Sequence, residues 1–447
     1  MTDNPEPTTL LTSLLTRTRK LGADSADAVL FHSAAVQVST RHLKPEGIER
    51  SESAALGLRA WVGHKQAIVS STDISLPAQA ELAERVVGMA RVATEDADST
   101  LARESLLARE VLPLDLCDAA EPSAEWLMQQ CRECEDAALS VPGITNSEGA
   151  EAGYGHSVIA LATDKGFAQR YSSSHFSVSV SVLAGEGTGM ERDYDYASVR
   201  HRADLPPAAG IGTSAAARTL KRLHPRKVAT AEVPVVFDPR VARSLLSAFA
   251  GAINGASVAR GTSFLKEAMG QPVFAPGISI VDNPHRMRGL GSRPFDGEGV
   301  TGGKIALVKD GMLKTWLLDT RTANKLKLAT TGHASRGIAS PPTPSSTNLY
   351  MEAGTQTPQE LMADIKSGFY VTETYGMGVN LVTGDYSQGS SGFWIENGQI
   401  AYPVSEVTIA GHLKEMFAQA TPANDLEFRY ATNTPTLRVE RMTVAGT

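Results

Sequence analysis

An alternation of apolar and small polar side chains runs without a slip through the middle of this 447-residue chain. Between Phe176 and Val182 every second residue is apolar, and the residues between are serines. Successive side chains of a strand point to opposite faces, so this pattern predicts a strand of an antiparallel sheet with one covered face. Similar β-branched, alternating or apolar segments predict further strands at residues 28–32, 36–40, 55–62, 67–71 and 158–161.

Helical segments are predicted on both sides of this strand-rich region. Five leucines between Leu10 and Leu21 recur at helical spacing and indicate an amphipathic helix at the start of the chain. Asp238 followed by Pro239 is typical of an N-cap and first turn, which predicts a helix that runs to about Ala252. The remaining helices are predicted at residues 78–93, 123–139 and 213–223.

Short strands and tight turns dominate the second half of the chain. The pairs Asp310-Gly311 and Asn397-Gly398 favour hairpins, because these residues tolerate positive φ angles. Strands are predicted at residues 233–237, 304–309, 314–318, 367–372, 378–383, 392–396 and 406–410. We therefore predict an α+β fold, with an N-terminal α/β domain of antiparallel sheet and long helices at 1–224 and a β-rich C-terminal domain at 225–447.

Charge and composition exclude several classes of protein. The net charge is −7, and residues 77–140 carry −9 while the rest carries +2, so a nucleic-acid partner is not expected. The three cysteines all lie in the N-terminal third, which fits a reducing cytoplasm rather than a disulfide framework. Residues 1–9 lack the features of a secretory signal. The longest uncharged run, 244–259, is 16 residues, shorter than the roughly 18 to 20 that span a bilayer. We predict a cytoplasmic protein without a membrane segment.

Two short motifs lack the context that their usual chemistry needs. Gly297, Gly299 and Gly302 match a dinucleotide-binding pattern, but no strand precedes them and no helix follows, so a glycine-rich loop feeding a strand is predicted. Cys131 and Cys134 form a CxxC inside a predicted helix without a second ligand pair, which favours structural cysteines.

The histidines form no recognised metal motif. None of the ten is followed by Glu, and no two lie three to five residues apart, so neither HExxH nor HExxxH is present. A GxSxG nucleophile elbow and a phosphate-binding P-loop are also absent from the sequence. The sequence therefore shows no recognised catalytic arrangement.

Several longer segments resemble one family. SRPFDGEGV at 292–300, GDYSQGSSGFWIENG at 384–398 and YPVSEVTIAG at 402–411 are similar to the TldD/PmbA family. NSEG at 146–149 and ERDYDY at 191–196 extend the likeness into the first half. The chain is identified as a member of the PmbA branch, also called TldE and once described as a modulator of DNA gyrase.

The resemblance implies that the zinc site of this family is missing from the chain. The zinc-bearing TldD branch carries HExxxH on a helix of the C-terminal domain and a further cysteine ligand near the C-terminus. The corresponding helix, near 239–256, has Ser247, Ala248 and Ala252 where that branch has His, Glu and His. No cysteine follows Cys134. We therefore expect no catalytic residue and no metal in this chain, and zinc in a TldD-like partner.

The resemblance also implies a division of labour. PmbA-like chains pair with TldD-like chains in a cytosolic peptidase that cleaves unfolded or flexible peptides, with leader-peptide processing and antitoxin degradation as family roles. This predicts a non-catalytic subunit, which forms a homodimer or a monomer when isolated. Two alternatives stay open: a peptide-binding regulatory protein without proteolytic role, and a stand-alone metallopeptidase with a dispersed site. Candidate ligands for such a dispersed site are His285, His333, His412, Asp385 and Glu406.

A glycine-rich segment supplies the predicted substrate surface. Closely spaced glycines between 384 and 398 permit near backbone approach, and polar and aromatic side chains lie among them. The residues predicted to line or border a substrate cavity are Gly384, Asp385, Tyr386, Gly389 and Trp394. The small residues of 248–256 predict either close approach of another backbone or internal packing.

Overall fold

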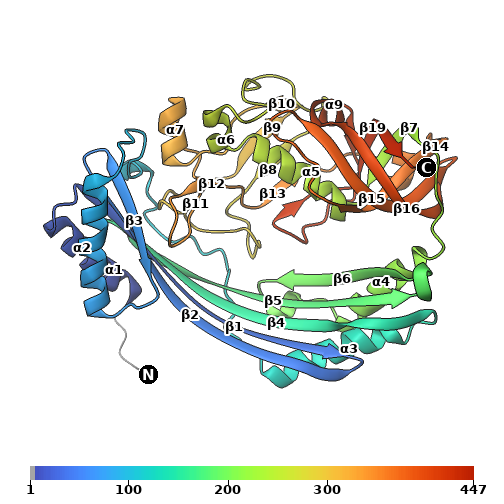
Figure 1. Cartoon of the computed structure of the whole chain (residues 1–447), viewed down its shortest axis with the longest axis horizontal. Coiled ribbons are helices and arrows are strands. Elements are labelled where there is room, and N and C mark those ends of the chain that lie inside the picture. The colour runs from blue at the N-terminus through green and yellow to red at the C-terminus, as the bar shows by residue number, and fades with distance from the viewer. Residues whose placement is uncertain (1–5, 447) are drawn as a thin grey trace.

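The computed structural model of the chain describes residues 6–446, and its largest element is a long curved sheet (Figure 1). Six antiparallel strands follow one another in the order β3-β2-β1-β4-β5-β6. Their bounds are β1 Ser25–Arg41, β2 Lys44–Val62, β3 Lys65–Ser71, β4 Ile144–Thr163, β5 Ala168–Ala184 and β6 Glu191–Val199. The antiparallel sheet is confirmed, and its strands are longer than predicted: the segments 28–32 and 36–40, for example, both belong to β1.

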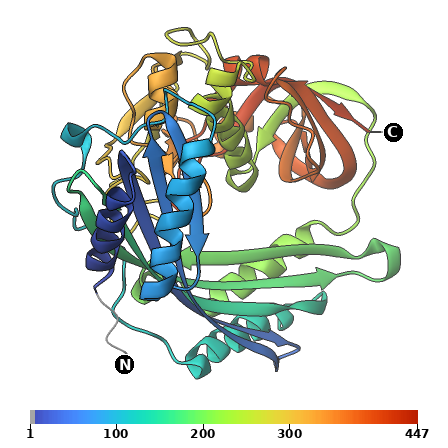
Figure 2. The same cartoon turned by 60° about the vertical axis from the view of Figure 1, so that its left-hand side comes forward.

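One face of this sheet is covered by helices. The helices are α1 Pro7–Lys20, α2 Leu76–Val92, α3 Ala124–Leu139 and α4 Ala208–Lys221. Leu30 packs in the cluster beneath α1 and α2, and Val38 in the cluster beneath α3 and α4. These two residues of β1 are eight positions apart and therefore lie on the same face. The leucine face of α1 is buried as predicted, and Figure 2 shows α1 and α2 together at one end of the sheet.

The start of α4 was predicted too late. The helix begins at Ala208 rather than near residue 213, through a stretch of alanine and glycine. Gly212 lies against α3 so closely that a Cβ there would be 2.0 Å from the carbonyl oxygen of Cys134. Close packing on α3 therefore stabilises the start of a helix that contains Gly210 and Gly212, residues of low helix propensity.

The C-terminal half is β-rich, as predicted. One sheet has the order β16-β15-β14-β7-β19-β17 and closes on itself through an additional β16–β19 pairing. Its strands are β7 Ala231–Phe237, β14 Ser367–Tyr375, β15 Asp385–Glu396, β16 Gln399–His412, β17 Ala420–Pro422 and β19 Leu437–Ala445. A second sheet, in the order β10-β9-β8-β13-β18, contains β8 Ile280–Asp282, β9 Ile305–Lys309, β10 Met312–Leu313, β13 Leu349–Met351 and β18 Thr432–Asn433.

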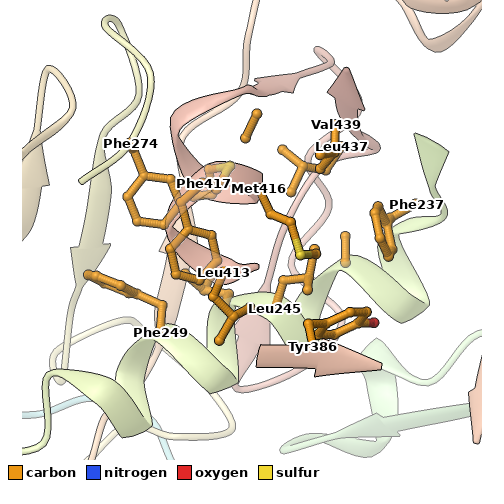
Figure 3. Packing of buried hydrophobic residues seen from close by; sticks show 14 of the residues in the cluster. Phe237, Leu245, Phe249, Phe274, Tyr386, Leu413, Met416, Phe417, Leu437 and Val439 are labelled. Atoms are coloured by element: carbon orange, nitrogen blue, oxygen red, sulfur yellow. The ribbon is translucent and has the colours of Figure 1, made fainter. Parts of the chain in front are cut away.

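Apart from α5, the remaining elements are short. The helices are α5 Pro239–Ala252, α6 Gly255–Arg260, α7 Thr320–Leu326, α8 Pro358–Met362 and α9 Leu413–Ala418. A two-stranded ribbon joins β11 Ala334–Ser335 to β12 Thr343–Pro344, and 3-10 turns lie at Glu104–Leu106, Gly187–Gly189 and Arg202–Asp204. Helices α5 and α9 pack on the closed sheet, where Phe249, Phe274 and Phe417 form part of one core (Figure 3).

Local turn signals were reliable. Asn397 and Gly398 join β15 to β16 with φ angles of 49° and 78°, and Asp310 and Gly311 join β9 to β10 with φ angles of 51° and 73°. Both predicted hairpins are thus confirmed, because each pair adopts the left-handed conformation that a tight turn of this type requires.

Two predicted strands were wrong. Residues 378–383 form turns with a single bridge from Val379 to Tyr386, because the Asn380 side chain accepts the backbone N–H of Val382 and closes the loop. In the predicted strand 314–318, the regular strand β10 ends at Leu313 and Leu317 forms only an isolated bridge with Asn254. The apolar run that follows is buried in the core instead of extending a sheet.

The two short motifs have structural roles. The segment containing Gly297, Gly299 and Gly302 is a loop that leads into β9, as predicted. Cys131 and Cys134 are buried on α3, and burial raises the pKa of each thiol to about 12, so both remain protonated. No helix among residues 6–446 has the length and apolarity to cross a membrane.

Candidate functional site

Helix α5 carries the three positions that the family resemblance aligns with the zinc motif, Ser247, Ala248 and Ala252. It begins where predicted, because the Asp238 side chain accepts the backbone N–H of Arg240 at 2.9 Å. Its apolar side packs into the C-terminal core, where Leu245 and Phe249 are almost fully buried (Figure 3). The helix is therefore held firmly on the closed sheet, with its opposite side facing away from the core.

The three aligned positions do not fit zinc. The Ser247 hydroxyl is exposed and donates to the carbonyl oxygen of Arg243 at 3.0 Å. Ala248 is half-buried against the core and Ala252 is fully buried, and both end in a methyl group. Zinc sites in proteins are built from thiolate, imidazole and carboxylate ligands, so this side-chain set supplies none of the usual donors.

The candidates for a dispersed metal site satisfy other partners. Within residues 6–446, no three His, Cys, Asp or Glu side chains group in a way that could hold a metal ion. His333 is buried with its Nε2 3.1 Å from Asp282, while His285 Nε2 lies 3.0 Å from the carbonyl oxygen of Thr301.

Strand register brings together one pair of these candidates. Asp385 on β15 lies opposite His412 on β16, and the Nε2 of that histidine is 3.0 Å from the carbonyl oxygen of Thr383. Glu406 forms an exposed ion pair with Lys227. The five candidate ligands therefore do not converge.

The small residues at the end of α5 pack against the chain itself. A Cβ at Gly251 would lie 2.8 Å from a methyl carbon of Leu381, and one at Gly255 would lie 2.6 Å from Leu318 and 2.8 Å from the carbonyl oxygen of Leu317. Internal packing, one of the two predicted roles of this segment, accounts for both glycines.

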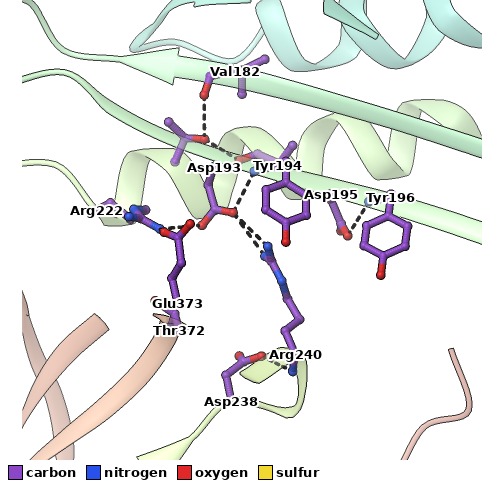
Figure 4. Close-up of polar contacts among 12 residues, drawn as sticks. Val182, Asp193, Tyr194, Asp195, Tyr196, Arg222, Asp238, Arg240, Thr372 and Glu373 are labelled. Carbon is purple, nitrogen blue, oxygen red and sulfur yellow. Dashed lines mark hydrogen bonds and ion pairs between the residues drawn. The ribbon is translucent and has the colours of Figure 1, made fainter. Parts of the chain in front are cut away.

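The exposed side of α5 meets the edge strand β6 through a charged cluster, which we call the junction network: Asp193, Arg222, Arg240 and Glu373 (Figure 4). Asp193 accepts from Arg240 Nη1 at 3.2 Å and Nη2 at 3.3 Å, and its other oxygen lies 3.5 Å from Arg222. Arg222 also donates to Glu373 of β14 at 2.6 Å. The network thus joins β6, α4, α5 and β14.

Electrostatics keep both arginines of the junction network charged. Burial alone would lower the pKa of Arg222, but the carboxylates of Glu373 and Asp193 outweigh it and raise that pKa. For Arg240 the opposing effects are burial, which lowers its pKa, and Asp193, which raises it. Both guanidinium groups of the junction network therefore carry their positive charge at neutral pH.

Aromatic rings extend the junction network along β6. The Arg240 guanidinium lies 4.4 Å from the centre of the Tyr194 ring, and Arg243 of α5 lies 4.1 Å from that of Tyr430. Tyr430 in turn stacks at a tilt on Tyr196, with 5.6 Å between centroids. Stacked arginines of α5 and tyrosines thus line the contact between α5 and β6.

Sequence reasoning singled out residues 191–196 as a motif but did not connect them with α5. Asp193 and Arg240 are 47 residues apart, so their pairing depends on how β6 and α5 are placed by the fold. The available signal was the regular alternation of acidic and tyrosine residues in this segment. On a strand, this alternation places the acidic side chains on one face and the rings on the other, which favours a half-buried edge strand whose acidic residues have charged partners.

A polar recess of about 330 Å³ lies on the other face of the long sheet, next to Tyr194. Glu148 there accepts from Ser181 at 2.8 Å and from Arg192 at 3.1 Å. The serines that alternate with the buried valines of β5 point to this face. Its hydroxyls and carboxylates can hydrogen-bond to a peptide backbone, but they do not assemble into a nucleophile with a base.

The predicted cavity-lining residues are divided between surface and core. Gly384, with φ of 94°, lies against the His412 ring, and Asp385 is exposed and accepts from Thr383 at 2.5 Å. Tyr386 and Trp394 are buried, with exposed fractions of 3% and 8%.

Gly389 is connected to the junction network through Tyr375 and Ser391. A Cβ there would lie 3.3 Å from the ring of Tyr375, whose hydroxyl is 2.5 Å from Ser391 Oγ. Ser391 in turn accepts from Arg222 at 3.0 Å. The glycine-rich strand β15 thus reaches the junction network through Ser391, and its role beside a substrate cavity stays a prediction.

Comparison with known proteins identifies relatives along almost the whole chain. Family models described as domain 1, the central domain and the C-terminal domain of PmbA/TldA metallopeptidases match residues 26–90, 117–223 and 230–446. Metalloprotease PmbA from Escherichia coli O157:H7 is 37% identical over 426 residues, which cover 95% of this chain and 93% of that protein.

Solved structures share the fold. A proposed modulator of DNA gyrase from Bacteroides thetaiotaomicron has a TM-score of 0.91 at 26% identity, with 99% of this chain and 100% of that chain covered. TldE from Thermococcus kodakarensis has a TM-score of 0.86 at 19% identity, with coverage of 97% and 99%. The latter likeness concerns the fold alone.

Proposed function

This chain belongs to the PmbA/TldD metallopeptidase family, and we propose that it is the non-catalytic, TldE-like subunit of a two-component zinc metallopeptidase. The observation that carries the proposal is the side-chain set at the zinc positions of α5. Ser247 offers an exposed hydroxyl, and Ala248 and Ala252 offer no donor atom. The family name implies a metal, and in this proposal a TldD-like partner in the cytoplasm holds it.

The role left to this chain is binding and positioning of the substrate. Peptide hydrolysis needs an activated water or nucleophile and a group that stabilises the oxyanion. The polar recess beside Tyr194 and the serine-bearing face of β5 offer hydrogen-bond donors and acceptors suited to an extended peptide. Unfolded or flexible peptides are the proposed substrates, because only an extended backbone exposes its amides to such a face. Leader peptides and antitoxins are the proposed examples.

Reconstitution tests the proposal. An unfolded fluorogenic peptide is incubated with this chain, with the TldD-like partner, and with both. We expect chelator-sensitive cleavage that is at least severalfold faster with both chains than with the partner alone, and none with this chain alone. A partner whose HExxxH glutamate is replaced by Gln should abolish cleavage in the mixture. Robust chelator-sensitive cleavage by this chain alone would overturn the proposal, and so would a mixture no faster than the partner.

A further inference from the structure

A second cavity, distant in sequence from α5, lies where the long sheet meets the glycine-rich loop. It has a volume of about 280 Å³. Its apolar walls come from three strands of the sheet and from the loop: Val29, Phe31, Ile159, Leu161, Tyr171 and Phe295. Phe295 is held edge-on against Tyr171, with 5.3 Å between ring centroids, so the aromatic wall is well ordered.

Two arginines also line this cavity, and both carry unpaired donors. The Arg336 side chain is 1% exposed, and its Nη1 lies 2.7 Å from Asp27 without good hydrogen-bond geometry. Its Nε and Nη2 have no acceptor among residues 6–446. Arg293 donates from Nη1 to the carbonyl oxygen of Ala334 at 2.8 Å, but its buried Nε and Nη2 likewise have no protein acceptor in the described part of the chain.

Unpaired buried donors of this kind point to a ligand. A buried polar group left without a partner is unfavourable, and more so when it is charged. Two guanidinium groups with four such N–H-bearing atoms on one small cavity therefore form a site complementary to an anion.

The nearby carboxyl groups leave these four donor atoms unpaired, although Asp27 pairs with Nη1 of Arg336 and Asp296 itself lines the cavity. Asp27 also pairs with Arg59, and Asp296 accepts the backbone N–H of Glu298, Val300 and Ala334 at 2.9 to 3.0 Å. Burial and the charge of Asp296 raise the pKa of Glu298 to about 8, which leaves that group protonated at neutral pH.

We propose that this cavity binds a peptide carboxylate, which pairs with Arg293 and Arg336 while the adjoining apolar side chain packs on Phe31, Tyr171 and Phe295. The inference rests on the proposed function, in that it takes a peptide to be the ligand of this chain. A carboxylate has two oxygens, and guanidinium groups match them in a planar, charge-assisted arrangement. The apolar walls cannot hydrogen-bond the further oxygens of a phosphate, so burying phosphate here would leave them unsatisfied.

The position of the cavity also suits a peptide. Along the sheet, the row Phe31, Ile159 and Tyr171 is followed on the same face by Ser33, Ser157 and Ser173. On this face of the sheet a strip of serine hydroxyls, which can hydrogen-bond a backbone, therefore follows the residues that line the apolar cavity. Either a C-terminal carboxylate or an acidic side chain supplies the required chemistry.

Calorimetric titration of the full-length chain, without a partner, tests the inference. The probes are acetyl-Gly-Gly-Phe with a free C-terminal carboxylate, the same peptide as an amide, acetyl-Gly-Asp-Phe-amide, and inorganic phosphate. We expect at least one carboxylate peptide to bind about tenfold or more tightly than the neutral amide, which corresponds to about 1.4 kcal/mol. The one that binds identifies the source of the carboxylate. Equal binding of acid and neutral peptides, or phosphate bound as tightly as the peptides, would overturn the proposal.

Variants locate the binding. Arg293→Gln should weaken binding of the carboxylate peptide at least tenfold and leave Arg336 paired with Asp27. Ile159→Phe should fill the cavity while keeping both arginines. It tests the site if Arg293→Gln fails to fold. Arg286→Gln is the matched control, because Arg286 stacks on Phe428 and does not line the cavity. Undiminished affinity in folded Arg293→Gln and Ile159→Phe would refute the site. Because binding is measured on the isolated chain, failure of the reconstituted peptidase is a separate result.

Discussion

Removing the Asp193 carboxylate should loosen the contact between the long sheet and α5. Asp193 is 6% exposed and accepts two bonds from Arg240, whose side chain is 11% exposed. In Asp193→Ala, Arg222 keeps Glu373, but Arg240 retains mainly the Tyr194 ring at 4.4 Å. The substitution therefore leaves one buried guanidinium without its carboxylate partner.

The expected cost follows from that burial. Breaking a buried ion pair by removing one partner costs about 3 to 5 kcal/mol. We expect the lower end, about 3 kcal/mol, because the slight exposure of Arg240 lets water reach part of the guanidinium and Arg222 remains paired. This change lowers the ratio of folded to unfolded chain by roughly a hundredfold.

Urea unfolding of the full chain, followed by circular dichroism, measures the effect. The matched control is Asp195→Ala on the same strand, because its partner Arg429 is 39% exposed and 3.5 Å away, which predicts a loss of about 1 kcal/mol or less. Asp193→Ala combined with Arg240→Met should recover most of the stability, since an apolar side chain needs no carboxylate. A loss below about 1 kcal/mol in Asp193→Ala, or one equal to that of the control, would refute the role given to the junction network.

Three further predictions concern pH, metal and the glycine-rich strand. Burial and Asp296 raise the pKa of Glu298 from 4.5 to about 8, so the folded chain keeps a proton that the unfolded chain loses. This group's contribution to stability should fall as pH rises from about 4.5 to about 8, and Glu298→Gln should flatten that slope in urea midpoints measured at pH 5, 6.5 and 8; an unchanged slope would contradict the assignment. Elemental analysis of the isolated, dialysed chain should find far less than one zinc per chain, and a stoichiometric content would revive a dispersed metal site. Gly389→Val should displace Tyr375, whose ring is 3.3 Å from the Cβ position. We expect the reconstituted peptidase to turn over substrate severalfold more slowly, while the circular dichroism spectrum of the chain stays unchanged. Full turnover would argue against a role for β15 in substrate binding.

Local chemistry accounts for the elements that the sequence predicted well. The side chain of Asp238 and the ring of Pro239 act within one turn, and α5 accordingly runs over the predicted residues. Asn397-Gly398 and Asp310-Gly311 need only their own φ angles to form hairpins. The alternation in β5 and the leucines of α1 likewise identify a buried face without reference to any partner.

Tertiary structure decided what local patterns could not express. The alternating residues of 378–383 form a turn because Asn380 closes a loop there, and α4 begins at Ala208 because its glycine lets α3 approach. The junction network and the proposed carboxylate site depend on pairings across long stretches of chain: Asp193 with Arg240, and Arg336 with Asp27. Residue type and spacing encode which face of an element is buried and which backbone φ angles its turns adopt. The burial of a charge and the identity of its partner arise only when distant elements pack together. The sequence therefore determined that α5 carries no His, Cys, Asp or Glu, and the fold decided which charged groups lie beside that helix and which are left unpaired in the cavity at the far end of the sheet.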